Sequence, residues 1–283
     1  MLNYNIIIVL VLFSTNISFS QGKYDRLLES GKYKKALKKI DRKLSKDSLA
    51  IDVLYSKVQL YNARDFKEFD SELSYELVND LERRYNYLSY EDQHGYGEDG
   101  ITEKSIELLR KNVISKAYED VTSYNDIEHY EYFLSFYSLM SAQVKRDIQG
   151  RIYDLAFEEV KKQNKVKKYN DFIYKYPDAP QIRKVKLMRD ECAFDNAKKE
   201  NSIAAFRDFI EHYPNAIQSK KAEQFIYKLA FNEILDSEDY QSFLQYYKRY
   251  PNSPYRSAAH DKYEYLLYKE ITQSGTLDSY LSF

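Results

Sequence analysis

The side chains with the clearest chemical potential in this chain are four histidines and one cysteine. His94 lies in a glycine-rich acidic segment close to Asp92, Glu98 and Asp99, and oxygen donors of this kind could hold a cation. Their spacing does not follow the D-x-D-x-D-G pattern of a calcium loop. We therefore predict that residues 91–102 form a solvated loop, with a metal or ligand loop as the alternative. His94 and its neighbour Tyr96 remain candidate partner-contacting residues.

The other candidate groups do not combine into a reactive site. His129, His212 and His260 are scattered, and no Ser/His/Asp arrangement or glycine-rich phosphate loop is visible. Cys192 is the single cysteine, which excludes an intrachain disulfide and any multi-cysteine metal site. It shares a repeat column with leucines, which predicts burial. The sequence thus predicts no catalytic, cofactor-binding or metal-binding residue, and a protein that is not an enzyme.

The charges are balanced, with 43 Lys+Arg against 44 Asp+Glu and a net charge of −1. No global field draws the chain to nucleic acid. One basic run includes Lys35, Lys39 and Arg42 and could bind anionic glycans or lipid headgroups. Ala36 and Ile40 alternate with these charges at helical spacing, so the simpler interpretation is the solvated face of an amphipathic helix.

Composition favours helices that bury a thin core. Seven glycines and five prolines are too few for the frequent turns of a β-sandwich or barrel. The 30 tyrosines suit a core one layer deep, because each ring can be buried while its hydroxyl stays in contact with water.

A repeat of 37 residues runs through the C-terminal two-thirds. Tyr-Pro occurs at 176–177, 213–214 and 250–251, and Ala-Phe occurs at 156–157, 193–194 and 230–231. Two aromatic columns keep the same step, with one interval of 39 residues: Tyr130, Tyr169, Phe206, Phe243 and Tyr280, and Phe133, Phe172, Phe209, Tyr246 and Phe283. Repeats in step at this period are typical of stacked supersecondary units.

Each repeat predicts two helices. In one of them Ile226, Leu229, Ala230 and Ile234 occupy one helical face, and in the next the paired aromatics stand at i and i+3. Proline then ends the second helix, since it cannot donate a backbone hydrogen bond. Such a pair cannot bury its apolar face alone, so the units must stack.

One outward column contains Tyr153 and Tyr227 together with Asp190 and Glu264. A column that accepts charge faces solvent. Tyr153 and Tyr227 are therefore candidates for a ligand-contacting surface.

The N-terminal third resembles the tetratricopeptide family. The residues that carry the likeness are Gly31 at a turn, Tyr33 and Ala36, in the order Gly-x-Tyr-x-x-Ala-Leu. The Phe-x-x-Tyr-x-x-x-Tyr-Pro-Asn-Ser run at 243–253 is also similar to repeats of envelope proteins, including the lipoprotein of outer-membrane barrel assembly. The resemblance implies an all-α, right-handed α-solenoid of stacked antiparallel helix pairs, with protein or peptide binding on its concave face.

The N-terminus predicts export. An apolar run at 6–13 precedes the small-x-small pattern Ser18-Phe19-Ser20, which is typical of a signal peptide over 1–20. We expect a helical block at 21–90, the loop at 91–102, and a five-unit repeat block at 103–283 whose last repeat is truncated. No lipobox cysteine follows the signal, so a periplasmic or secreted protein with only peripheral membrane association is expected.

These features predict an exported, non-catalytic interaction scaffold that binds other envelope proteins or peptides without a cofactor. The alternative is a carbohydrate or envelope-polymer binding module that uses exposed tyrosines and the lysine-rich face.

Overall fold

The computed structural model describes residues 24–281, and over this range the regular structure is entirely α-helical apart from one short 3-10 turn. The predicted all-α class is confirmed. The predicted signal peptide at 1–20 lies outside the described residues. None of the described helices is both long enough and apolar enough to cross a bilayer. The chain divides into two compact units, one ending at Gln149 and the other beginning at Gly150.

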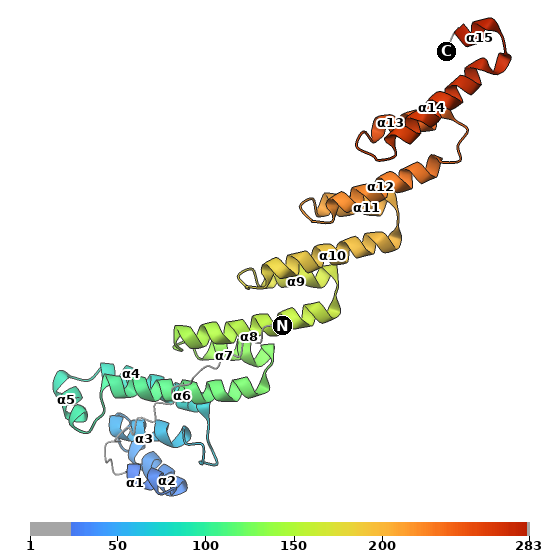
Figure 1. Cartoon of the computed structure of the whole chain (residues 1–283). Helices are drawn as coiled ribbons and strands as arrows, with labels where there is room; N and C mark the ends of the chain where they lie inside the picture. Colours follow the sequence, from blue (N-terminus) through green and yellow to red (C-terminus); the bar gives the residue numbers. More distant parts are fainter. Residues whose placement is uncertain (1–23, 282–283) are drawn as a thin grey trace, which may run out of the picture. The chain divides into compact units, whose positions relative to one another are not determined.

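In the N-terminal unit most helices pack on their neighbours in sequence, and α4 packs directly on α6 although α5 lies between them in the sequence (Figure 1). The helices are α1 (Asp25–Glu29), α2 (Tyr33–Leu44), α3 (Ile51–Tyr61), α4 (Ser71–Asn86), α5 (Tyr90–Glu98), α6 (Glu103–Tyr124) and α7 (Ile127–Phe136). Gly31 lies at the α1–α2 turn with a φ of +69°, a conformation that glycine adopts without strain. The ring of Tyr33 packs against Phe66 at 5.7 Å, and Ala36 is fully buried.

The prediction of a loop at 91–102 is wrong for most of this segment, because residues 90–98 form the helix α5. The hydroxyl of Ser89 accepts a hydrogen bond from the Asp92 amide and caps this helix. Acidic residues in the first turn also stabilise the helix, because they interact favourably with the positive end of its dipole. Gly95 and Gly97 each cost the helix about 1 kcal/mol, and capping of this kind offsets part of that cost. The break between the compact units also lies elsewhere, within α8 (Ala142–Gln163).

The C-terminal unit continues from the second half of α8 as alternating long and short helices (Figure 1). They are α9 (Val166–Lys175), α10 (Ile182–Glu200), α11 (Ile203–His212), α12 (Ser219–Ile234), α13 (Tyr240–Arg249), α14 (Arg256–Ile271) and α15 (Leu277–Leu281). Each Tyr-Pro follows a short helix directly, so Tyr176, Tyr213 and Tyr250 are the C-caps of α9, α11 and α13. The predicted helix ends are confirmed.

The short helices carry the centre of the core. Their paired aromatics are at most 4% exposed: Tyr130 and Phe133 on α7, Tyr169 and Phe172 on α9, Phe206 and Phe209 on α11, and Phe243 and Tyr246 on α13. The long helices pack on these rings, as where Phe206 stacks on Phe225 of α12 at 4.9 Å. The first four members of each aromatic column are therefore used for packing, as the sequence predicts.

Asparagine ends several long helices. Asn125, Asn164 and Asn201 all adopt a left-handed backbone conformation, which asparagine tolerates better than most residues. The Tyr130 hydroxyl donates to Asn125 Oδ1 at 3.1 Å, and the Tyr169 hydroxyl donates to Asn164 Oδ1 at 2.9 Å. In both places, the asparagine that ends a long helix also accepts the hydrogen bond of a buried tyrosine hydroxyl on the following short helix.

We predict that Phe206→Ala lowers the free energy of unfolding by about 3–5 kcal/mol, because it removes a fully buried ring from a packed site. Urea unfolding followed by circular dichroism measures this loss. The control is Tyr174→Ala on α9, which removes a ring that is 91% exposed and should change stability by less than about 0.5 kcal/mol. Equal effects of the two variants would contradict the assigned core.

Candidate functional site

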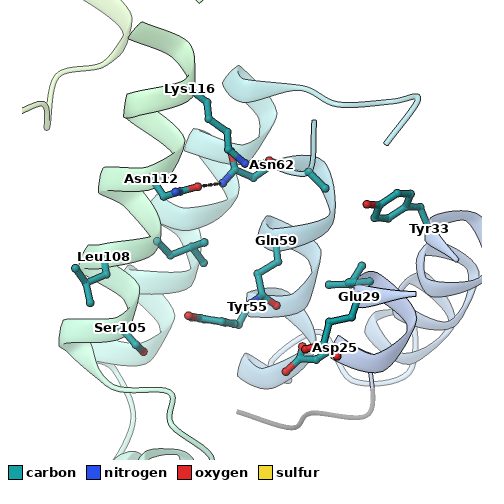
Figure 2. Close-up of a pocket in the computed structure, with 13 residues that line it drawn as sticks. Asp25, Glu29, Tyr33, Tyr55, Gln59, Asn62, Ser105, Leu108, Asn112 and Lys116 are labelled. Atoms are coloured by element: carbon teal, nitrogen blue, oxygen red, sulfur yellow. Dashed lines mark hydrogen bonds between the residues drawn. The ribbon is translucent and has the colours of Figure 1, made fainter. Parts of the chain in front are cut away.

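Two buried polar atoms without a hydrogen-bond partner lie beside an open cavity between α3 and α6, and α1 forms one side of this cavity. We call this cavity of about 280 Å³ the α3–α6 pocket (Figure 2). Its lining combines apolar side chains with amides and charges: Asp25, Leu28, Glu29, Tyr33, Tyr55, Gln59, Asn62, Ala63, Ser105, Leu108, Leu109, Asn112 and Lys116. All of them belong to the N-terminal unit.

Helical spacing brings the polar side chains to one surface. Tyr55, Gln59 and Asn62 are separated by four and three residues, so they share one face of α3. The apolar residues Val53, Leu54, Val58 and Leu60 of α3 are buried. On α6, Asn112 and Lys116 are four residues apart and lie opposite that face (Figure 2). Polar side chains of the two helices therefore face each other across the pocket.

The amides in the pocket are only partly paired. Asn62 is 4% exposed, and its Nδ2 donates to Asn112 Oδ1 at 2.7 Å (Figure 2). Its own Oδ1 and the buried Oε1 of Gln59 have no hydrogen-bond partner among the described residues. A buried acceptor without a donor costs about 1–3 kcal/mol. A ligand that supplies N–H donors would recover this free energy.

The two ends of the pocket differ in charge. Lys116 lies at one end, and Asp25 and Glu29 lie at the other (Figure 2). The Lys116 Nζ donates to the backbone carbonyl of Asn62. Burial, and then the positive charge of Arg64, lower the pKa of Lys116. Burial is the main cause of the raised pKa of Tyr55, which hydrogen-bonds with Ser105. The phenol of Tyr55 therefore stays protonated at neutral pH and is available as a donor.

The residues predicted from the N-terminal third lie elsewhere. Lys35, Lys39 and Arg42 are all exposed on α2, as expected for its solvated face. His94 is exposed on α5, and its ring is parallel to that of Tyr90 at 6.4 Å. Tyr96 is half-buried, and burial is the main cause of its raised pKa, while a hydrogen bond with the Ile51 backbone acts to lower that pKa. None of these five lines the α3–α6 pocket.

The residues predicted from the repeats are partly packed. Tyr153 and Tyr227 are half-buried, with rings edge-on to Tyr176 and Tyr250 at 5.7 Å in both cases. The structure thus pairs each with a Tyr-Pro ring of its own repeat. The predicted burial of Cys192 is confirmed, since it is 9% exposed with its Sγ donating to the Asn164 carbonyl at 3.3 Å.

Sequence reasoning missed the residues that form the pocket, although a signal was present. The signal is the pair Gln59 and Asn62, since these polar residues lie within and directly after the apolar series Val53, Leu54, Val58 and Leu60. Nothing in the sequence shows that α6, some 50 residues away, supplies the opposite wall.

In residues 24–281, no group of three or more His, Cys, Asp or Glu side chains is arranged to hold a metal ion. No family model, curated protein or solved structure matches this chain. The assignment of function therefore depends on the chemistry of the described surfaces.

We predict that Arg64→Met raises the pKa of Lys116 towards its ordinary value of 10.5. Arg64 contributes a repulsive positive charge and also pairs with Glu119 and Asp120, so its removal leaves both carboxylates free to favour the charged amine. The titration can be followed from the lysine ¹³Cε resonance. Arg64→Lys keeps the charge and should change this pKa less, and an unchanged pKa in Arg64→Met would contradict the assignment.

Proposed function

We propose that this protein is an exported, non-catalytic interaction scaffold that binds peptide segments of envelope proteins. The α3–α6 pocket supports this most directly, because it keeps two buried amide oxygens without donors beside an apolar wall. A peptide offers both complements, since its backbone supplies N–H donors and its side chains supply apolar surface. Charges of opposite sign at the two ends favour one direction of binding.

The repeat pattern supports a right-handed α-solenoid of stacked antiparallel helix pairs, similar to that of the tetratricopeptide family. In the C-terminal unit, contacts between helices join neighbours in sequence, as expected when each pair packs on the next. The export signal at 1–20 supports a periplasmic or secreted location with only peripheral membrane association.

The alternative, a glycan or envelope-polymer binding module, would use Tyr153, Tyr227 and the lysine-rich face of α2. Both tyrosine rings already pack edge-on against another ring, which leaves less ring face for stacking on a sugar. We therefore place peptide binding first. Sedimentation of the protein with peptidoglycan that is lost in Tyr227→Ala would reverse this order.

Gln59→Leu provides the sharpest test of the peptide proposal. Its Oε1 is buried without a donor, so replacing the amide by an apolar group should raise the free energy of unfolding by about 1 kcal/mol. The same change removes an acceptor that the ligand needs. Linear peptides selected from a random library on the full chain should therefore bind Gln59→Leu roughly tenfold more weakly.

Gln218→Leu is the matched control, because Gln218 Oε1 is also buried without a partner but lies in the C-terminal unit. It should gain similar stability and bind the selected peptides as the wild type does. Thermal unfolding and fluorescence anisotropy of labelled peptides give the two readouts. Wild-type affinity in Gln59→Leu, or an equal loss in Gln218→Leu, would refute the role of the pocket.

A further inference from the structure

A second pocket of the N-terminal unit lies where the start of α4 meets the end of α6 and the length of α7. It measures about 280 Å³, and we call it the α6–α7 pocket. Its base is formed by Phe133 and Tyr137, which are 2% and 3% exposed, with ring centroids 4.8 Å apart. Its rim carries Tyr124 and Tyr132, which are 62% and 48% exposed. Aromatic rings thus line both the base and the rim.

The rim is held in place by local contacts. The Tyr124 ring stacks on His129 with centroids 4.2 Å apart and planes within 11°. Asp126, the N-cap of α7, accepts a hydrogen bond from the His129 amide at 2.9 Å and contacts the imidazole as well. Tyr132 hydrogen-bonds with Glu72. These contacts hold the rim tyrosines before a ligand arrives, which lowers the entropic cost of binding.

The charge around this pocket is negative. Between Lys116 and Lys145 the sequence has no lysine or arginine, but it contains five acidic residues. Glu72 and Asp120 line the pocket directly. Arg64 pairs with Asp120, whereas Glu72 hydrogen-bonds with the rim residue Tyr132.

The repeat supplies an internal comparison. In the third repeat, 76 residues further along, an equivalent pocket of about 240 Å³ keeps the base ring pair as Phe209 and Tyr213. The two rim tyrosines and the histidine stacked on one of them are all replaced there. Glu200 takes the place of Tyr124, Ala205 that of His129 and Asp208 that of Tyr132. The base belongs to the packing columns that every repeat needs. The rim rings make only local contacts, Tyr124 with His129 and Tyr132 with Phe136, and the third repeat keeps its base pair without them. The packing that the repeats share therefore does not require an aromatic rim.

We propose that the α6–α7 pocket binds a lysine or arginine side chain of the peptide partner. Ring faces attract cations through their quadrupole, and the carboxylate of Glu72 accepts hydrogen bonds from an ammonium or guanidinium group. A quaternary ammonium would use the rings but could not donate to the carboxylate. The proposal rests on the proposed function only in that the cation belongs to a peptide.

The test compares the peptide acetyl-Ala-Ala-Lys-Ala-Ala-amide with the same peptide carrying neutral norleucine. Full-length protein with ¹³C-labelled tyrosine rings is titrated, and the shifts of Tyr124 and Tyr132 are followed by NMR. We expect the lysine peptide to shift both resonances and the norleucine peptide to bind at least fivefold more weakly. Tyr132→Leu keeps apolar bulk and should weaken lysine-peptide binding roughly fivefold to tenfold.

The controls separate this site from the α3–α6 pocket. Tyr174→Leu removes an exposed tyrosine outside both pockets and should bind the lysine peptide as the wild type does. Gln59→Leu should also leave this binding intact, and Tyr132→Leu should leave the library-selected peptides bound in the α3–α6 pocket. Equal binding of the norleucine peptide, wild-type affinity in Tyr132→Leu, or binding of choline in preference to lysine would each overturn the proposal.

Discussion

The pair of aromatic rings at i and i+3 on each short helix is the contact on which the helix pairs depend. On α7, α9, α11 and α13 these rings are buried almost completely, and the long helices pack on them. A ten-residue helix has little stability of its own in water, so it persists because its apolar face is buried. The Tyr-Pro that follows three of these helices ends them within a turn of the second ring.

Because these buried rings provide the packing between helices, other positions in each repeat are free to vary. The base of the α6–α7 pocket recurs in the third repeat because packing requires it, whereas the rim changes from aromatic to acidic and small. The repeated backbone thus places similar pockets in the first and third repeats, with a different chemistry in each. Recognition by a scaffold of this kind arises from the residues that packing does not use.

The α3–α6 pocket follows a different principle. Two amide oxygens remain buried without donors, and such atoms are a cost to the free protein. Natural interiors pair nearly all of their buried polar groups. An exception beside an open cavity points to a donor that arrives from outside. The α3–α6 pocket thus favours the N–H groups of a peptide, and the α6–α7 pocket separately favours a basic side chain.

The sequence by itself determined the helical class, the 37-residue repeat and the ends of the short helices, because periodic burial and proline act locally. It also determined that Cys192 and the aromatic columns belong to the core. It did not determine that residues 90–98 are helical, since the glycines of this segment favour a loop while the Ser89 cap and the acidic first turn favour a helix.

Only the tertiary structure showed the pockets. The pairing of Asn62 with Asn112 joins residues 50 positions apart, and no local pattern encodes which helix will face which. The candidate residues chosen from exposure and charge, such as Lys35 and His94, remain on the surface away from both pockets. Periodicity shows which face of a helix is buried, whereas packing alone decides which polar groups are buried together and which of them are left without a partner.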